Sequence, residues 1–555
     1  MTTFLRRTGM QIPWLKLLAR HHVIWCLVVS ALLPLNSYAA DDPAANNRLE
    51  PALKLLKTGS FKEKLHAIEL LAASGDPLAL NYLKPLLQAR LYYRKDNGDI
   101  VIAEREGSQY QLTAPVDGTA LGRVKKRSIK KITINNAMRR LLREKIAGLS
   151  LTNPDPKIRE AAVNEMITSR ANGLARTLKG LVDQEEDASV KALMQTGIAL
   201  GVLDTGTDEE KIAAISQLSH SLNPAVRNRL EQLSADAGTS KIGKAARKAL
   251  VTIEGRVAFY NHIETLFFGL SLGSVLVLAA IGLAITFGVM GVINMAHGEL
   301  IMLGAYTTYL IQQMMPAYIG WSLLVAVPAA FLVSGAVGIV IERGIIRFLY
   351  GRPLETLLAT FGVSLILQQI VRTVISPQNV PVLNPSWMSG SLQVNSVLSL
   401  TYNRLYIIVF SLAVFIALFL VLKKTRLGLG VRAVSQNRAM ARAMGVRSGR
   451  VDAMTFGLGS GIAGVAGVAL SQLTNVGPNL GQSYIIDSFM VVVFGGVGSL
   501  LGTLVAGLSL GVANKILEPS VGAVLAKILV LVFIILFIQK RPRGLFPQKG
   551  RAVEN

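Results

Sequence analysis

Residues 262–288, with the sequence HIETLFFGLSLGSVLVLAAIGLAITFG, decide the fold class of this chain. Glu264 is the only acidic residue in this stretch, which contains no lysine or arginine. About 20 mainly apolar residues are enough for a helix to cross the hydrocarbon core of a bilayer. The sequence therefore predicts a transmembrane helix here, and we expect a membrane protein.

Eight further apolar stretches follow, in a part of the chain that is almost free of acidic residues. Of the 34 acidic residues, 26 lie in 41–260 and eight follow. Only 17% of the chain is charged, against about 25% in soluble domains, so a simple soluble enzyme is excluded. We predict an all-α transmembrane bundle in 259–555 with spans at 262–288, 297–313, 320–342, 354–375, 404–422, 452–474, 484–498, 500–517 and 522–539.

The first 39 residues have the pattern of an export signal. Four basic residues precede the apolar run 23–35, and Ser37 and Ala39 place small residues at a cleavage site. We predict a signal peptide at 1–39 that is cleaved after Ala39, with an uncleaved anchor as the alternative. Both place the following residues outside the cytoplasm. Cys26, the single cysteine, lies in this segment, so we expect no disulfide or cysteine–zinc site in the mature chain.

Residues 40–258 have the periodicity of a helical-repeat domain. Helical patterns recur as pairs about every 35–45 residues, and many begin with a capping residue or a proline, as in HEAT-like α-solenoids. The predicted helices are 61–73, 132–149, 156–169, 173–182, 189–203, 209–222, 224–235 and 241–253.

A small β insertion is predicted within this domain. Strand patterns at 100–103 and 110–112 flank polar turns, and Asn97-Gly98 is a strong turn signal. We interpret the basic cluster that follows as a solvated loop, with contact to lipid headgroups or to an acidic partner as the alternative. The cluster comprises Lys125, Lys126, Arg127, Lys130 and Lys131.

Nothing in the sequence indicates an enzyme. Residues 238–245 nearly match a phosphate-binding loop, but Ala245 stands where a hydroxyl must hold magnesium, and no apolar strand precedes them. The six histidines include no pair with the spacing of zinc ligands. We therefore expect that this chain does not hydrolyse ATP and binds neither a cofactor nor a metal.

Basic residues set the predicted orientation of the spans. Most of those after residue 260 lie in three clusters, at 343–352, 423–450 and 540–551, whereas the loop 376–403 has none. The positive-inside rule places the clusters in the cytoplasm and the loop outside. Counting back three spans from the first cluster puts residue 260 outside, in agreement with the export signal. The net charge of +24 is thus accounted for by topology, and we expect no nucleic-acid partner.

Small residues recur one helical turn apart in the predicted spans, and such pairs let helices approach closely in lipid. Gly459-x-Gly461-x-x-Gly464 also matches a dinucleotide-binding fingerprint, but no strand precedes it, so we interpret it as a packing motif. The pairs are Gly269/Gly273, Gly457/Gly461, Gly498/Gly502 and Gly507/Gly511.

Seven polar residues at membrane depth are candidates for a substrate path, because polar groups are costly there. Helix capping and interhelical hydrogen bonding are the alternative for those that open the second span. For Asp487, close to the outer interface, a solvated carboxylate is the preferred interpretation. The candidates are Asn294, His297, Glu299, Gln368, Gln369, Asp487 and Ser488.

The loop 423–451 is expected to carry a short docking helix. Gly428 and Gly430 permit a turn, and residues 437–444 then form a helix that includes Met440 and Met444. A partly apolar helix ringed by arginine suits a groove on a partner protein. A basic loop that only anchors the topology is the alternative.

Four motifs within 294–546 resemble those of the branched-chain amino acid ABC importer permeases. The long N-terminal extension is a departure from those permeases and resembles the urea ABC transporter permease, which implies urea as the substrate. The motifs are Asn294-Met-Ala-His297-Gly-Glu299 with Gly304-Ala305-Tyr306, Thr425-Arg-Leu-Gly428 with Arg432-Ala433, Ala441 and Gly445, Gly495-Gly496-Val-Gly498-Ser499-Leu-Leu-Gly502, and Arg541-Pro-Arg-Gly544-Leu-Phe546.

The resemblance implies an alternating-access machine in a bacterial inner membrane. Besides membrane lipid, its partners would be a second permease subunit, two ATPase subunits and a periplasmic substrate-binding protein. The N-terminal domain would be periplasmic and the C-terminus cytoplasmic. A branched-chain amino acid or short-amide permease, and a passive channel or receptor without an ATPase, are the alternatives. The implied ATPase-docking residues are Arg432, Ala433, Met440, Ala441, Met444 and Gly445.

Overall fold

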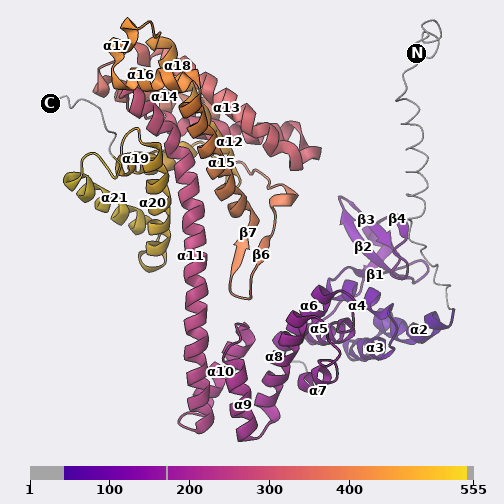
Figure 1. Ribbon diagram of the computed structural model, residues 1–555. Coiled ribbons are helices and arrows are strands. Elements are labelled where there is room, and N and C mark those ends of the chain that lie inside the picture. Colours follow the sequence, from indigo (N-terminus) through magenta and orange to yellow (C-terminus); the bar gives the residue numbers. More distant parts are fainter. Residues whose placement is uncertain (1–42, 170–172, 547–555) are drawn as a thin grey trace, which may run out of the picture. The chain divides into compact units, whose positions relative to one another are not determined.

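The computed structural model describes residues 43–169 and 173–546, and the chain divides into two compact units, Met1–Gly201 and Val202–Asn555 (Figure 1). The predicted signal peptide, with Cys26 and Ala39, lies outside the described residues. Each unit has its own hydrophobic core and is considered by itself.

The first unit is mainly helical, and the helices predicted in it are present with end points shifted by up to four residues. Ser60 and Glu63 form a capping box that fixes the start of α3, because each side chain accepts a hydrogen bond from the other residue's backbone N–H. Two helices, α2 and α4, were not predicted. The helices are α2 (Pro43–Thr58), α3 (Phe61–Ala73), α4 (Ala79–Leu87), α5 (Asn136–Ser150), α6 (Pro156–Ser169), α7 (Leu174–Lys179) and α8 (Ala188–Thr205).

The β insertion is larger than predicted. β2 and β3 confirm the two strand patterns, and Gly98, with φ of +79°, lies in the predicted turn. The basic cluster is not a loop: Lys130 and Lys131 lie on the edge strand β5, which pairs with β1. Lysine side chains on an edge strand protect it from pairing with other chains. The antiparallel sheet has the order β4-β3-β2-β1-β5, with β1 (Leu91–Arg94), β2 (Ile100–Glu106), β3 (Gln109–Thr113), β4 (Ala120–Lys125) and β5 (Ile129–Lys131).

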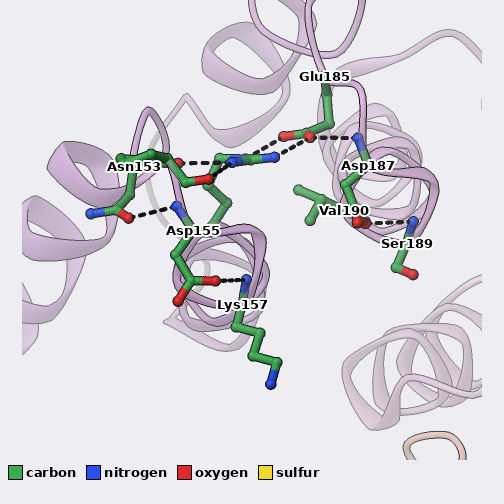
Figure 2. Close-up of polar contacts among 9 residues, drawn as sticks. Asn153, Asp155, Lys157, Glu185, Asp187, Ser189 and Val190 are labelled. Atoms are coloured by element: carbon green, nitrogen blue, oxygen red, sulfur yellow. Dashed lines mark hydrogen bonds and ion pairs between the residues drawn. The ribbon is translucent and has the colours of Figure 1, made fainter. Parts of the chain in front are cut away.

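An ion pair joins α6 to the turn that precedes α8 in the first unit (Figure 2). Arg159 on α6 donates to both oxygens of Glu185, at 2.8 and 2.6 Å, and its Nη1 donates to the carbonyl of Asn153 at 2.8 Å. The Arg159 guanidinium lowers the pKa of Glu185, which is therefore ionised at neutral pH. Glu185 also accepts from the backbone N–H of Asp187, so one carboxylate orders the turn before α8.

The second unit begins in the last turn of α8 and continues with α9 (Asp208–Leu218) and α10 (Pro224–Asp236), which pack against α11 (Lys241–Met290). α11 is continuous over 50 residues. The break predicted between 253 and 262 is therefore absent, and the expected domain boundary at 258/259 falls within this helix. Ser240 caps α11 by accepting from the Gly243 N–H at 3.1 Å, so the segment that resembles a phosphate-binding loop is a helix start.

A helix is present at each of the nine predicted spans, although not all of them meet the criteria for a membrane span. Among the described residues, seven helices are long and apolar enough to cross a membrane, namely α11, α13, α14, α15, α18, α20 and α21. α12 and α19 do not meet this criterion; α19 has only 16 residues. The helices after α11 are α12 (His297–Met314), α13 (Ile319–Gly344), α14 (Pro353–Val374), α15 (Tyr402–Lys424), α16 (Arg426–Gln436), α17 (Arg438–Ala443), α18 (Ser448–Ser471), α19 (Leu480–Gly495), α20 (Leu500–Val521) and α21 (Ala523–Lys540).

The predicted turn at Gly428 and Gly430 is wrong, because both glycines lie inside α16. Gly428 is needed there for packing: a Cβ at this position would overlap the backbone of Leu422 at the end of α15. The absence of a side chain thus lets the chain fold back sharply into a second helix.

Glycines bring the central helices together, as predicted. α18 packs against α11, α12 and α13. A Cβ on Gly459 would lie 2.7 Å from the carbonyl oxygen of Gly282 on α11, and one on Gly464 would lie 2.5 Å from that of Ala330 on α13. The dinucleotide-like motif is therefore a helix-packing motif.

The loop between α14 and α15 reaches the helices that precede the bundle. It forms a hairpin of β6 (Ser391–Gln393) and β7 (Ser399–Thr401). Ser396, in the turn of this hairpin, donates from Oγ to the carbonyl of Leu222 at 2.9 Å, in the turn between α9 and α10. The hairpin and the α9–α10 turn thus lie at the same end of the second unit.

Candidate functional site

A buried carboxylate lies at the start of α12. Glu299 is 1% exposed, and its Oε1 accepts from Gln368 Nε2 at 2.6 Å and from Ser364 Oγ at 3.0 Å. Ser364 and Gln368 are both buried and lie one turn apart on α14. This interaction joins two of the predicted path residues, Glu299 and Gln368, and adds Ser364, which was not predicted.

Asn294 and His297, which lie close to Glu299 in the sequence, are completely buried. Asn294 Oδ1 accepts from the N–H of Ala296 at 3.0 Å, which closes a turn before α12 but does not cap the helix, because the N-cap residue is Ala296 and it has no side-chain cap bond. A ring nitrogen of His297, Nε2, lies 2.8 Å from the carbonyl oxygen of Ala279 on α11. His297 therefore ties α12 to α11.

Each of these three residues keeps one polar atom without a hydrogen-bond partner among the described residues. The atoms are Asn294 Nδ2, His297 Nδ1 and Glu299 Oε2. Buried polar groups are almost always paired, and at membrane depth an unpaired one is especially costly. Capping alone does not account for this arrangement, which leaves hydrogen-bonding capacity for a further polar group.

The other three predicted path residues do not join this cluster. Gln369 is exposed, next to buried Gln368, and donates to Thr373 Oγ1 at 3.4 Å. Ser488 Oγ donates to the carbonyl of Tyr484 within its own helix. The solvated carboxylate expected at Asp487 is wrong: this residue is 7% exposed and pairs with Lys527 on α21 at 2.9 Å.

The short helix predicted in the loop 423–451 is present as α17. Asn437 caps it by accepting from the Met440 N–H at 2.9 Å. Met440 and Met444 are 61% and 77% exposed, whereas Ala441 between them is buried. Gly445 ends the helix with φ of +87°, a conformation that other residues adopt only with strain. We refer to Met440 and Met444 as the methionine face.

The remaining predicted docking residues lie on α16. Arg432 is exposed, and its guanidinium donates to the carbonyl of Leu422 at the end of α15. Ala433 is half-buried. Arg432 therefore stabilises the fold between α15 and α16 and does not project freely from it.

An ion pair on another side of α17 was not predicted. Arg438 donates from Nη1 and Nη2 to the two oxygens of Asp452 on α18, at 2.7 and 3.0 Å, and its guanidinium lies 4.1 Å from the ring centroid of Tyr350. Arg442 Nε donates to Ser448 Oγ at 2.8 Å. Asp452 is the only acidic residue between Glu355 and Asp487. Its isolation in the sequence was the signal that could have identified this ion pair.

The described residues contain no group of three or more His, Cys, Asp or Glu side chains that could hold a metal ion. The chemistry available at the start of α12 is thus hydrogen bonding by an amide, an imidazole and a carboxyl group. Such a site can bind or pass a small polar molecule.

Comparisons with known proteins identify relatives of the bundle. The family described as "Branched-chain amino acid transport system / permease component" matches residues 265–538. The high-affinity branched-chain amino acid transport system permease protein LivH of Escherichia coli (strain K12) is 31% identical over 296 residues, which are 52% of this chain and 96% of the relative. Its counterpart BraD of Pseudomonas aeruginosa is 32% identical over 295 residues, with the same coverage.

A more distant similarity reaches a sugar permease. The ribose import permease protein RbsC of Escherichia coli (strain K12) is 31% identical over 109 residues, which are 18% of this chain and 34% of the relative. No solved structure matches the chain. These similarities all concern permease components.

Proposed function

Because the chain belongs to the branched-chain amino acid transport permease family, we propose that it forms the membrane path of an ABC importer. As the substrate of this importer we propose urea. The chain is then a permease and not an enzyme, and separate subunits hydrolyse the ATP. Branched-chain amino acids, the substrates named for LivH and BraD, are the second candidate.

The unpaired polar atoms at the start of α12 are the proposed binding groups for urea. Urea is neutral and presents a carbonyl acceptor and two amino donors. The amide Nδ2 of Asn294 suits the carbonyl, and the free Oε2 of Glu299 suits an amino group. An amino acid would also bring a carboxylate and an ammonium group, whereas urea is neutral and needs no charged partner.

The N-terminal extension also supports urea over an amino acid. The family match begins at residue 265, and about half of this chain is enough to cover 96% of LivH. The residues before the match therefore have no equivalent in that amino acid permease. This agrees with the resemblance of the extended chain to urea permeases.

Transport assays distinguish the two substrates. We expect vesicles containing the assembled importer to accumulate labelled urea only when ATP is present, with no loss of uptake in about a hundredfold excess of leucine, since the two solutes share no charged group. Vesicles without ATP serve as the control for passive urea permeation. ATP-dependent accumulation of leucine, without urea, would identify an amino acid permease instead.

We propose that residues 40–258 form an exported HEAT-like repeat domain on the periplasmic side of a bacterial inner membrane, after cleavage of the signal peptide. The contact between Ser396 and Leu222 supports this orientation, because the loop 376–403 lacks basic residues and is expected outside. The C-terminus and α17 are then cytoplasmic.

Reporter fusions test this orientation. A reporter that is active only outside the cytoplasm is expected to give signal when fused after residue 200, and none when fused after residue 435, because the basic clusters hold the second site inside. The two fusions control for each other's expression. Signal from the second fusion alone would invert the proposed topology.

The proposed mechanism is alternating access. A periplasmic binding protein delivers the substrate, and two ATPase subunits dock on this chain and on a second, related permease subunit. The methionine face of α17 is the proposed docking surface, because exposed apolar side chains on a short helix fit a groove on a partner. Closure of the ATPases would move α17, and the bundle would open inward.

A further inference from the structure

We propose that the Arg438–Asp452 ion pair is the joint that transmits movement of α17 to the transmembrane bundle. We use the term "joint" for Arg438, Asp452 and Tyr350. The inference rests on the proposed function, since it assumes that a partner pushes on α17, and it assigns these three residues a positioning role.

The two sides of α17 are chemically different. Arg438 and Arg442, one turn apart, hold α18 through Asp452 and Ser448, whereas Met440 and Met444 are exposed. A six-residue helix is too short to be stable by itself. α17 therefore keeps its position through its bonds to α18, and a force on the methionine face passes into α18.

The geometry of the joint suits the transmission of force. Arg438 makes two parallel hydrogen bonds to one carboxylate, and this bidentate arrangement restricts rotation more than a single bond does. The Tyr350 ring, in the segment between α13 and α14, lies against the same guanidinium. Asp452 is 5% exposed and the Arg438 side chain 20%, so the pair is screened less by salt than an exposed ion pair.

α18 connects the joint to the buried carboxylate site. A Cβ on Gly467 of α18 would overlap the backbone of Ile301 on α12, two residues after Glu299. Ser334 of α13 donates to the carbonyl of Leu300, the residue next to Glu299, at 3.0 Å, and its side chain also contacts Gly464 of α18. With backbones this close, α18 cannot slide without moving α12, and a shift of α17 reaches Glu299.

The test compares coupling with assembly in the reconstituted importer. We expect Asp452→Asn and Arg438→Gln to retain the ATPase subunits and to hydrolyse ATP. The amount of urea taken up per ATP hydrolysed should fall about tenfold, because the coupling between the ATPases and the bundle is weakened. The charge swap Arg438→Asp/Asp452→Arg should restore a large part of this ratio. Lys424→Gln, which removes an exposed cation at the end of α15, is the matched control and should leave the ratio unchanged.

A second readout does not depend on the identity of the substrate. A thiol reagent would label a Ser364→Cys variant in which Cys26, the single native cysteine, is replaced by serine. The labelling rate should change when ATP is added, and Asp452→Asn should abolish that change. Failure of urea uptake in the unmodified importer, together with a normal ATP-dependent labelling change, would refute the substrate and leave the joint standing.

Two results would overturn the joint. One is a normal ratio of uptake to ATP in both single variants. The other result comes from Arg438→Lys, which serves if the first two variants fail to insert into the membrane. This variant keeps the positive charge but loses the bidentate hydrogen bonds to Asp452. We expect it to insert normally with a reduced ratio, and normal coupling in Arg438→Lys would refute the proposal.

Discussion

Replacing Met440 and Met444 together by aspartate is expected to abolish ATP-dependent uptake and the association of the ATPase subunits. Both side chains are more than half exposed, so the substitution leaves the interior of the permease unchanged. In the assembled importer, however, two carboxylates would have to enter an apolar groove, and an unpaired buried charge costs about 3–5 kcal/mol. The measurements are co-purification of the ATPases and uptake in membrane vesicles.

A conservative variant separates docking from a general loss of structure. Met440→Leu/Met444→Leu keeps the volume and apolar character of the methionine face, and such exchanges are well tolerated. It should retain both association and uptake. If the double aspartate variant behaves like the double leucine variant, α17 is only a topological anchor, and a passive channel becomes the better interpretation of the bundle.

Gly464→Leu is expected to prevent the bundle from folding. A Cβ at this position would lie 2.5 Å from both the carbonyl oxygen of Ala330 and Ser334 Oγ on α13, while the backbone of Gly464 also contacts Gly304 of α12. Overpacking commonly costs about 1–3 kcal/mol, and we expect the upper end or beyond here, because backbone atoms cannot rotate away. The measurement is the yield and thermal stability of monodisperse protein in detergent.

Gly362→Leu is the matched control, because it makes the same substitution in another spanning helix. Nothing lies within 4 Å of a Cβ at Gly362 in α14. This variant should be produced at nearly the normal yield with normal stability. Equal yields for the two leucine variants would show that α12, α13 and α18 are less closely packed than described.

Local signals in the sequence explain why most helices were predicted correctly. Asn223 and Pro224 stand at the start of α10, and the capping box at Ser60 stands at the start of α3. The continuity of α11 could not be predicted in this way. Its residues 254–261 carry no apolar span pattern, and the contacts there come from the preceding helices, as in the hydrogen bond from Arg256 to the carbonyl of His220, which the local pattern does not reveal.

The same distinction applies to the candidate site. Glu299 was identifiable because a carboxylate at membrane depth is unusual. Ser364 was not, because serine is common in transmembrane helices and only the fold brings it to Glu299. The environment of Asp487 was predicted wrongly because its partner, Lys527, lies 40 residues further along the chain. The Arg438–Asp452 pair likewise forms only when α17 folds back onto α18.

The continuous α11 extends well beyond the point at which it enters the bundle. The helix enters the bundle near Gly269, where it meets α20, and from Lys241 to that point it extends for about 42 Å at 1.5 Å per residue. If α11 tilted as a straight rod by about 10° at the crossing with α20, its far end would move by about 7 Å. α9 and α10, packed on this lever arm, would travel with it. A tilt of about 10° within the bundle would thus correspond to a displacement of several ångström at the start of α11.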